Sequence, residues 1–245
     1  MAGAKRLDGW ALQWYVQNVM DLWEDVSPNS YEVLLDQGLL IDVGIEIGVV
    51  KPDDPKGKNN TYSAIQACRR IPTIRYLALD EPFSSGKELN LSTEDVVASV
   101  AKFTKTLRPL VQEIGLIEQI PNHTAEEIVS YMEELQQIGQ SPSFLHLDMD
   151  RLAMRNQGIR TWRNDLNTLY DHCFAWGIPF GVILWTPNLS PRDPDFYRRE
   201  VKRWYRQVMQ EILPDRWIVQ SWDAVEGHTQ PPVDILLQTL EEVNG

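Results

Sequence analysis

The stretch Phe144-Leu145-His146-Leu147-Asp148-Met149-Asp150 decides the fold, because apolar and polar residues alternate along it. Alternation with a period of two predicts a β-strand, whose successive side chains point to opposite faces of a sheet. One face would be aliphatic and would pack against helices. The opposite face would carry the polar residues of the stretch, which are His146, Asp148 and Asp150. The rise along a strand would place Asp148 about 6.5 to 7 Å from Asp150.

The same unit recurs along the chain, as an apolar run followed by a loop and an amphipathic segment. Further strands are predicted at Leu39 to Val50, Ile74 to Asp80, Ile114 to Ile120, Phe180 to Thr186 and Trp217 to Trp222. Helices are predicted from Thr93 to Leu110, after the capping box of Thr124 and Glu127, from Thr161 to Trp176, and from Asp193 to Leu213. Such alternation predicts a parallel sheet with crossover helices. The longest predicted loops, Lys51 to Tyr62 and Arg151 to Arg160, both follow strands.

The number of strands decides the architecture. Trp10 to Asn18 alternates with a period of two, which favours a seventh strand over the rival helix from Trp10 to Trp23. Seven strands, with one more missing at the amino end, would make an incomplete (β/α)8 barrel of the TIM type, and 245 residues suit that fold. A flavodoxin-like open sheet is the alternative, but its phosphate-binding glycine loop is absent. No composition break divides residues 1–245, so we expect one α/β domain.

The amino-acid composition limits the classes of partner that this protein could bind. The net charge of −12 disfavours nucleic acid and anionic membranes as main partners, although a local basic patch is compatible with it. No apolar run is long enough to span a membrane. The two cysteines are too few for a disulfide scaffold or a cysteine zinc site. A missing first strand would leave unpaired sheet edges, which predicts a homodimer or a covering segment.

We expect no signal peptide at the amino end, because no apolar segment follows Met1-Ala-Gly-Ala-Lys5-Arg6. This abrupt start is what a chain that has lost a leader or a first element would show. Two locations therefore stay open: secretion or the periplasm, with a leader absent from this chain, or the cytoplasm.

Carboxylates follow or end four consecutive predicted strands. They are Glu46, Asp80 with Glu81, Glu118, and Asp148 with Asp150. The carboxyl ends of barrel strands meet at one mouth, where active sites are built. Asp148 and Asp150 would share this site, and one of their two pKa values should rise because two close negative charges repel. The alternative for each residue is that it caps the next helix or faces water.

Aromatic residues are predicted around the same mouth. The candidates are Tyr15, Phe83, Trp185 and Trp222, and core packing is the alternative for each. Trp185 and Trp222 end the last two predicted strands, so they are the best candidates to stack on a sugar ring. His146 is predicted to orient a carboxylate rather than bind a metal. The sequence contains no GxSxG, P-loop, GxGxxG or HExxH pattern, so we predict no cofactor and no resident metal.

Several short motifs resemble a poorly characterised group of bacterial glycoside-hydrolase-like (β/α)8 barrel proteins. The motifs are Ile45-Glu46-Ile47-Gly48, Leu77-Ala78-Leu79-Asp80-Glu81-Pro82-Phe83, Gly115-Leu116-Ile117-Glu118, Phe144 to Asp150, Pro179-Phe180-Gly181-Val182-Ile183 and Gln220-Ser221-Trp222. The resemblance implies a TIM-barrel glycosidase fold and a carbohydrate substrate. It also implies that Glu81, in Asp80-Glu81-Pro82, is the acid that ends the fourth strand. The sequence departs from that pattern at Leu184-Trp185-Thr186, where such enzymes carry a nucleophilic carboxylate.

Three functions follow as hypotheses. The first is a glycoside hydrolase with Glu81 as the acid and Glu118 or Asp148 as its partner, oriented by Asp150. Sugar hydroxyls would then be bound by Glu46, Asp80, His146, Trp185, Gln220, Trp222 and Tyr15. The second is a barrel that binds carbohydrate without cleaving it. The third is a barrel enzyme that uses a divalent metal held by carboxylates such as Glu46 and Glu118.

Overall fold

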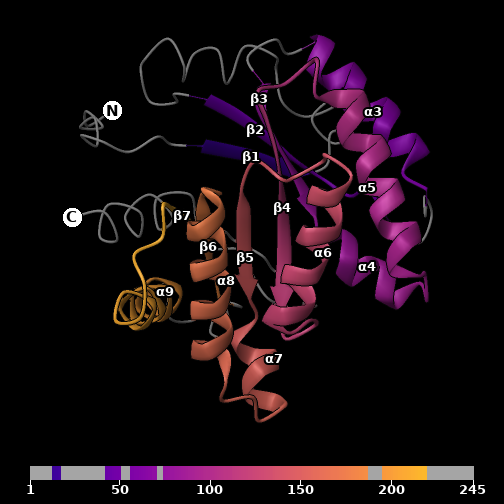
Figure 1. Cartoon of the computed structure of the whole chain (residues 1–245). Coiled ribbons are helices and arrows are strands. Elements are labelled where there is room, and N and C mark those ends of the chain that lie inside the picture. Colours follow the sequence, from indigo (N-terminus) through magenta and orange to yellow (C-terminus); the bar gives the residue numbers. More distant parts are fainter. Residues whose placement is uncertain (1–12, 18–41, 51–55, 71–73, 187–194, 220–245) are drawn as a thin grey trace, which may run out of the picture. The chain divides into compact units, whose positions relative to one another are not determined.

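A computed structural model describes residues 13–17, 42–50, 56–70, 74–186 and 195–219 (Figure 1). The described residues divide into two compact units. The first comprises residues up to 118 together with 128–145, and the second comprises 119–127 and the residues from 146 onward. The single domain expected from the sequence stays a prediction.

The first unit contains four parallel strands whose order in the sheet follows the chain. They are β1 (Gln13–Gln17), β2 (Asp42–Ile47), β3 (Ile74–Asp80) and β4 (Glu113–Ile120), of which β4 belongs to this unit up to Glu118. The strand β1 lies inside the segment whose alternation favoured a strand over a helix, so that prediction is confirmed. The helices of the first unit are α3 (Lys58–Arg70), α4 (Pro82–Glu88), α5 (Thr93–Leu107) and most of α6 (Ala125–Gln137).

Local sequence signals explain where the helices of this unit begin. The Ser92 side chain accepts a hydrogen bond from the Asp95 backbone N–H and caps α5. The predicted capping box is also present, since Thr124 and Glu127 exchange hydrogen bonds of 2.9 and 3.2 Å between backbone and side chain. Helices α3 and α5 contact each other (Figure 1).

The second unit contains most of β5 (Leu145–Met149), with β6 (Phe180–Leu184) and β7 (Arg216–Val219), and the last two pair in parallel. Its helices are α7 (Arg151–Asn156), α8 (Trp162–Trp176) and α9 (Asp195–Val208), and both α8 and α9 contact β6. Helix α8 ends as predicted at Gly177, whose left-handed backbone, with φ of 65°, suits glycine.

Several predicted bounds need correction. The stretch Arg151 to Arg160, expected to be a loop, begins with helix α7, and the expected loop Lys51 to Tyr62 ends in the first turn of α3. Helix α9 stops at Val208 rather than Leu213, and α5 stops at Leu107 rather than Leu110. Strand β3 has the predicted bounds, and β4 begins one residue earlier than predicted. Strand β5 is one residue shorter than predicted at each end, and β6 ends at Leu184 rather than Thr186.

The core of each unit is aliphatic and aromatic. In the first unit it includes Leu77, Leu79, Phe103, Leu107 and Leu116, and in the second Leu147, Leu169, Phe180, Val201 and Trp204. In the described part of the chain, no helix is long and apolar enough to cross a membrane.

Candidate functional site

Strand register in the first unit sorts the predicted carboxylates onto two faces of the sheet. Glu46 of β2 pairs with Ala78 of β3, and Ala78 pairs with Gly115 of β4. Asp80, two residues after Ala78 in β3, pairs with Ile117 of β4. Paired residues of parallel strands share a face, so Glu46 and Asp80 lie on one face. Glu118 follows Ile117 and therefore has the opposite parity, that of the aliphatic residues Leu79 and Leu116.

Glu118 is fully buried at the start of helix α4. Its Oε1 accepts a hydrogen bond from the backbone N–H of Phe83 at 3.1 Å, and its Oε2 accepts one from the Ser84 hydroxyl at 3.4 Å. Burial raises the pKa of Glu118 well above its usual range, because removing a carboxylate from water disfavours its charged form. The hydrogen bond from Phe83 opposes this shift, and the negative charges of Glu81 and Asp80 add to it.

Glu81 occupies an uncommon backbone conformation between β3 and α4. Its φ of 42° and ψ of 51° lie in the left-handed region, which costs a residue with a side chain about 1–2 kcal/mol. The Glu81 side chain is half-buried and makes no capping hydrogen bond to α4. Backbone strain of this kind gathers at functional sites, where the surrounding structure holds it in place.

The second unit holds the other predicted carboxylates. Asp148 is half-buried in β5 and accepts a hydrogen bond of 2.5 Å from the indole Nε1–H of Trp185. Asp150 caps helix α7 by accepting a hydrogen bond of 2.8 Å from the Ala153 backbone N–H. The helix-capping alternative weighed for these acidic residues is therefore realised at Asp150.

His146 is buried in β5 and stays uncharged near neutral pH. Burial lowers its pKa to about 3, and the nearby positive charge of Arg216 contributes to that shift. A Cβ atom added to Gly181 would lie 2.6 Å from the His146 ring carbon Cδ2, so the ring occupies the space left by that glycine. Whether His146 orients a carboxylate stays a prediction.

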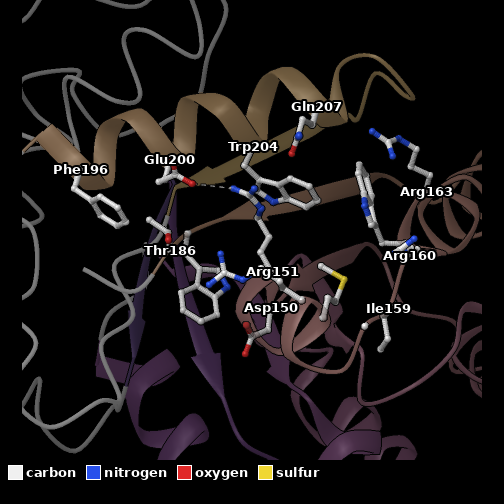
Figure 2. Close-up of a pocket in the computed structure, with 15 residues that line it drawn as sticks. Asp150, Arg151, Ile159, Arg160, Arg163, Thr186, Phe196, Glu200, Trp204 and Gln207 are labelled. Atoms are coloured by element: carbon white, nitrogen blue, oxygen red, sulfur yellow. Dashed lines mark ion pairs between the residues drawn. The ribbon is translucent and has the colours of Figure 1, made fainter. Parts of the chain in front are cut away.

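A cavity of about 440 Å³ opens in the second unit at the carboxyl ends of β5 and β6. Asp150, Trp185 and Thr186 line it from the strand ends, and Phe196, Glu200, Trp204 and Gln207 line it from α9 (Figure 2). The remaining wall comes from α7, α8 and the segment between them, with Arg151, Met154, Arg155, Gly158, Ile159, Arg160, Trp162 and Arg163.

The aromatic wall differs from the predicted one. Trp185 is 9% exposed, and its indole edge is engaged by Asp148, so little of its ring can stack on a ligand. Phe196 and Trp162 keep more exposed ring surface in the same cavity. Trp222 and Gln220 lie outside the described residues, and of Tyr15 only the backbone, in β1, is described.

Sequence reasoning missed the arginines of this cavity. The net charge of −12 disfavoured nucleic acid and anionic membranes as partners and left room for a local basic patch, and such a patch exists around α7. The available signal was the run Arg151-Leu152-Ala153-Met154-Arg155-Asn156, which follows a capping aspartate and consists mostly of good helix formers.

The described carboxylates and histidines bear on the metal-dependent hypothesis. Among the residues that the structure describes, no group of three or more His, Cys, Asp or Glu side chains could hold a metal ion. The metal-dependent hypothesis therefore receives no support from the described carboxylates.

Comparisons with known proteins place the fold. No family model matches the chain, and no curated protein matches it. Among solved structures, a β-mannanase from Streptomyces thermolilacinus matches with a TM-score of 0.58 at 14% identity, over 95% of this chain and 76% of that one. A glucosidase from Croceicoccus marinus matches with a TM-score of 0.51 at 11% identity, over 79% of this chain. The match spans 46% of the glucosidase chain.

A malate synthase from Haloferax volcanii also matches, with a TM-score of 0.47 at 13% identity, over 94% of this chain and 75% of that one. At these identities the likeness shows the fold and not the reaction. The fold is an α/β fold of the partial TIM-barrel kind, as predicted from the sequence.

Proposed function

We propose that this protein is a glycoside hydrolase that acts on a carbohydrate through carboxyl groups at the carboxyl ends of its strands. The observation that carries the proposal is the turn between β3 and α4, where Glu81 has a strained backbone and a half-buried side chain. Separate support comes from the cavity of the second unit, which Asp150 lines together with aromatic rings. Aromatic rings stack on the apolar faces of sugars, and polar groups among them bind the hydroxyls. The glycosidases among the solved structures with this fold support the proposal by analogy.

Glu81 is the proposed proton donor of the reaction. Glycosidic cleavage needs one protonated carboxyl for the leaving oxygen and one ionised carboxylate as the nucleophile or the base. Three observations support Glu81: its place directly after β3, its strained backbone, and its half-buried side chain. Glu118 would act as a positioning residue, because its hydrogen bonds to Phe83 and Ser84 hold the turn that presents Glu81.

The second carboxyl has two candidates, Glu118 and Asp148. Glu118 has no exposed surface with which to contact a substrate, whereas Asp148 is half-buried and held by Trp185. We therefore expect Asp148→Asn to abolish turnover and Glu118→Gln to reduce it only partly. If Glu118→Gln abolished turnover in a folded protein and Asp148→Asn did not, this assignment of roles would be reversed.

The experiment is reducing-sugar release by the wild-type protein across a broad panel of neutral and acidic glycans, with and without a metal chelator. The proposal expects release from at least one glycan, unchanged by the chelator. Release that disappeared with the chelator would favour the metal-dependent hypothesis. No release from any glycan would contradict the hydrolase.

One observation favours a second candidate, a barrel that binds carbohydrate without cleaving it. Two of the four predicted catalytic carboxyls have structural roles, because Asp150 caps α7 and Glu118 is fully buried against α4. This candidate expects saturable sugar binding by calorimetry, with no release of reducing ends.

A further inference from the structure

The cavity of the second unit carries an excess of positive charge. Four arginines and two carboxylates, Asp150 and Glu200, line it. The Arg163 Nε lies 2.7 Å from Oε1 of Glu211, a residue that does not line the cavity. This ion pair cancels one of the four positive charges. One positive charge is therefore left over, in a protein whose net charge is −12.

Arg151 is the central cation of the cavity. Its side chain is 26% exposed, and its guanidinium carbon lies 4.8 Å from the centre of the Trp204 ring (Figure 2). Its ion pair with Glu200 spans 3.7 Å, which is beyond hydrogen-bonding distance. Within the described ranges, no hydrogen bond engages the Arg151 guanidinium, which carries five N–H donors in a planar fork.

The surroundings of Arg151 favour a monoanion. Burial lowers its pKa, and so does the repulsion of Arg155 and Arg203, while Glu200 raises it. An added negative charge would offset that burial and repulsion. A dianion such as a phosphate would overcompensate the single excess charge and would meet the carboxylates of Asp150 and Glu200. A carboxylate carries one charge, and its two oxygens match the planar fork of a guanidinium.

Ring surface lies beside this cation. Phe196 projects from α9 into the cavity (Figure 2), and the Trp162 ring meets the Trp204 ring edge-on, with centroids 4.8 Å apart. The volume of 440 Å³ falls in the lower part of the range of small-molecule sites, about 300–1,000 Å³. A ligand that satisfies both features combines a carboxylate with a ring.

We propose that this cavity binds a hexuronate residue, with the sugar carboxylate held by Arg151 and the ring beside Phe196. The inference rests on the proposed function, because it names the substrate class as acidic glycans. The evidence for it is the positive charge and the aromatic lining of the cavity. All residues that line this cavity belong to the second unit.

Calorimetric titration with glucuronate, galacturonate and mannuronate, each compared with its methyl ester, tests this inference. The ester keeps the ring and removes the charge. We expect at least one uronate to bind about tenfold or more tightly than its ester, since a hydrogen bond to a charged group contributes that much. Equal affinity of acid and ester, or no binding of any uronate, would overturn the inference. Acetate, a monocarboxylate without a sugar ring, should bind more weakly than the uronate, and equal binding would also overturn it.

Two variants locate the binding. Arg151→Lys keeps the charge but loses the fork, and it should weaken uronate binding about tenfold. Arg206→Met removes an exposed arginine of α9 that does not line the cavity, and it should bind as the wild type does. Equal losses in both variants would show that the loss is not specific to the Arg151 guanidinium and would overturn the assignment.

The outcomes separate this inference from the proposed function. Binding and cleavage of neutral glycans, with no uronate preference, would leave the hydrolase standing and refute the uronate site. Uronate binding that depends on Arg151, without cleavage of any glycan, would support the site and refute the hydrolase.

Discussion

The buried carboxyl group of Glu118 accepts a hydrogen bond from the backbone N–H of Phe83, at 3.1 Å. This bond replaces a local helix cap, because the residue before α4, Glu81, makes no side-chain capping bond. A side chain from a neighbouring strand thus completes the start of α4. In doing so it holds the turn that carries the proposed proton donor.

Replacing Glu118 should change how stability depends on pH. The pKa of Glu118 is raised in the folded protein, so its stabilising contribution is complete below about pH 4.3, the ordinary glutamate pKa. The contribution is lost as pH rises from there through the folded pKa, by at most about 1.4 kcal/mol per pH unit. Glu118→Gln does not titrate, so its melting temperature should fall less than that of the wild type between pH 4.5 and 8.

A matched truncation separates titration from packing. Glu118→Ala removes the acceptor of both hydrogen bonds and leaves a cavity, so it should cost about 2–4 kcal/mol at every pH. Parallel pH profiles for the wild type and Glu118→Gln would show that the buried carboxyl does not titrate as described.

Relaxing the backbone at Glu81 should stabilise the protein while abolishing its activity. Glu81→Gly removes the cost of a left-handed conformation for a residue with a side chain, for a net gain of about 1 kcal/mol in the free energy of unfolding. The control is Asn90→Gly at the other described non-glycine residue with positive φ, 54°. Asparagine tolerates this region, so urea unfolding should show a smaller gain there. A loss of stability in Glu81→Gly would mean that side-chain contacts of Glu81 outweigh the strain.

Gly181 should be intolerant of a side chain because of His146. An added Cβ would lie 2.6 Å from His146 Cδ2 and 3.0 Å from Ile218 Cδ1. We expect Gly181→Ala to cost about 1–3 kcal/mol in urea unfolding. In a double-mutant cycle with His146→Ala, part of that cost should be recovered, and additive losses would place the strain elsewhere.

His146 should make the protein sensitive to acid. Its folded pKa of about 3 lies below the usual histidine value near 6.5, so its contribution is present above about pH 6.5 and is lost as pH falls through about 3. His146→Gln has no titrating ring, so its stability should fall less steeply than that of the wild type between pH 6 and pH 3.5. Denaturant unfolding at several pH values measures this difference, and identical slopes would contradict the depressed pKa.

Local signals in the sequence were enough to predict most of the elements. The alternation around Trp14 indicated β1, the pair Thr124 and Glu127 indicated the start of α6, and Gly177 indicated the end of α8. These signals act within a few residues along the chain. Helix α7 was missed because its six residues are too short to show helical periodicity, although its capping Asp150 was visible.

The contacts of the candidate site could not be predicted in the same way. Glu118 and Phe83 are 35 residues apart, and Trp185 and Asp148 are 37 apart, so only the folded chain brings them together. Overall charge also concealed the arginines near α7, because a sum over the whole chain does not report a local excess. The proposed roles of Glu46, Asp80, Gln220 and Trp222 stay predictions.

The most direct test of the central claim compares reducing-sugar release by the wild-type protein, Glu81→Gln and Glu88→Gln on neutral and acidic glycans. Glu88 is an exposed glutamate at the end of α4, so its variant makes the same chemical change a few residues away. The account predicts release by the wild type and Glu88→Gln, and a loss of about 100-fold or more in Glu81→Gln, the range for removing a general acid. Equal release by Glu81→Gln and the wild type would contradict the role given to Glu81.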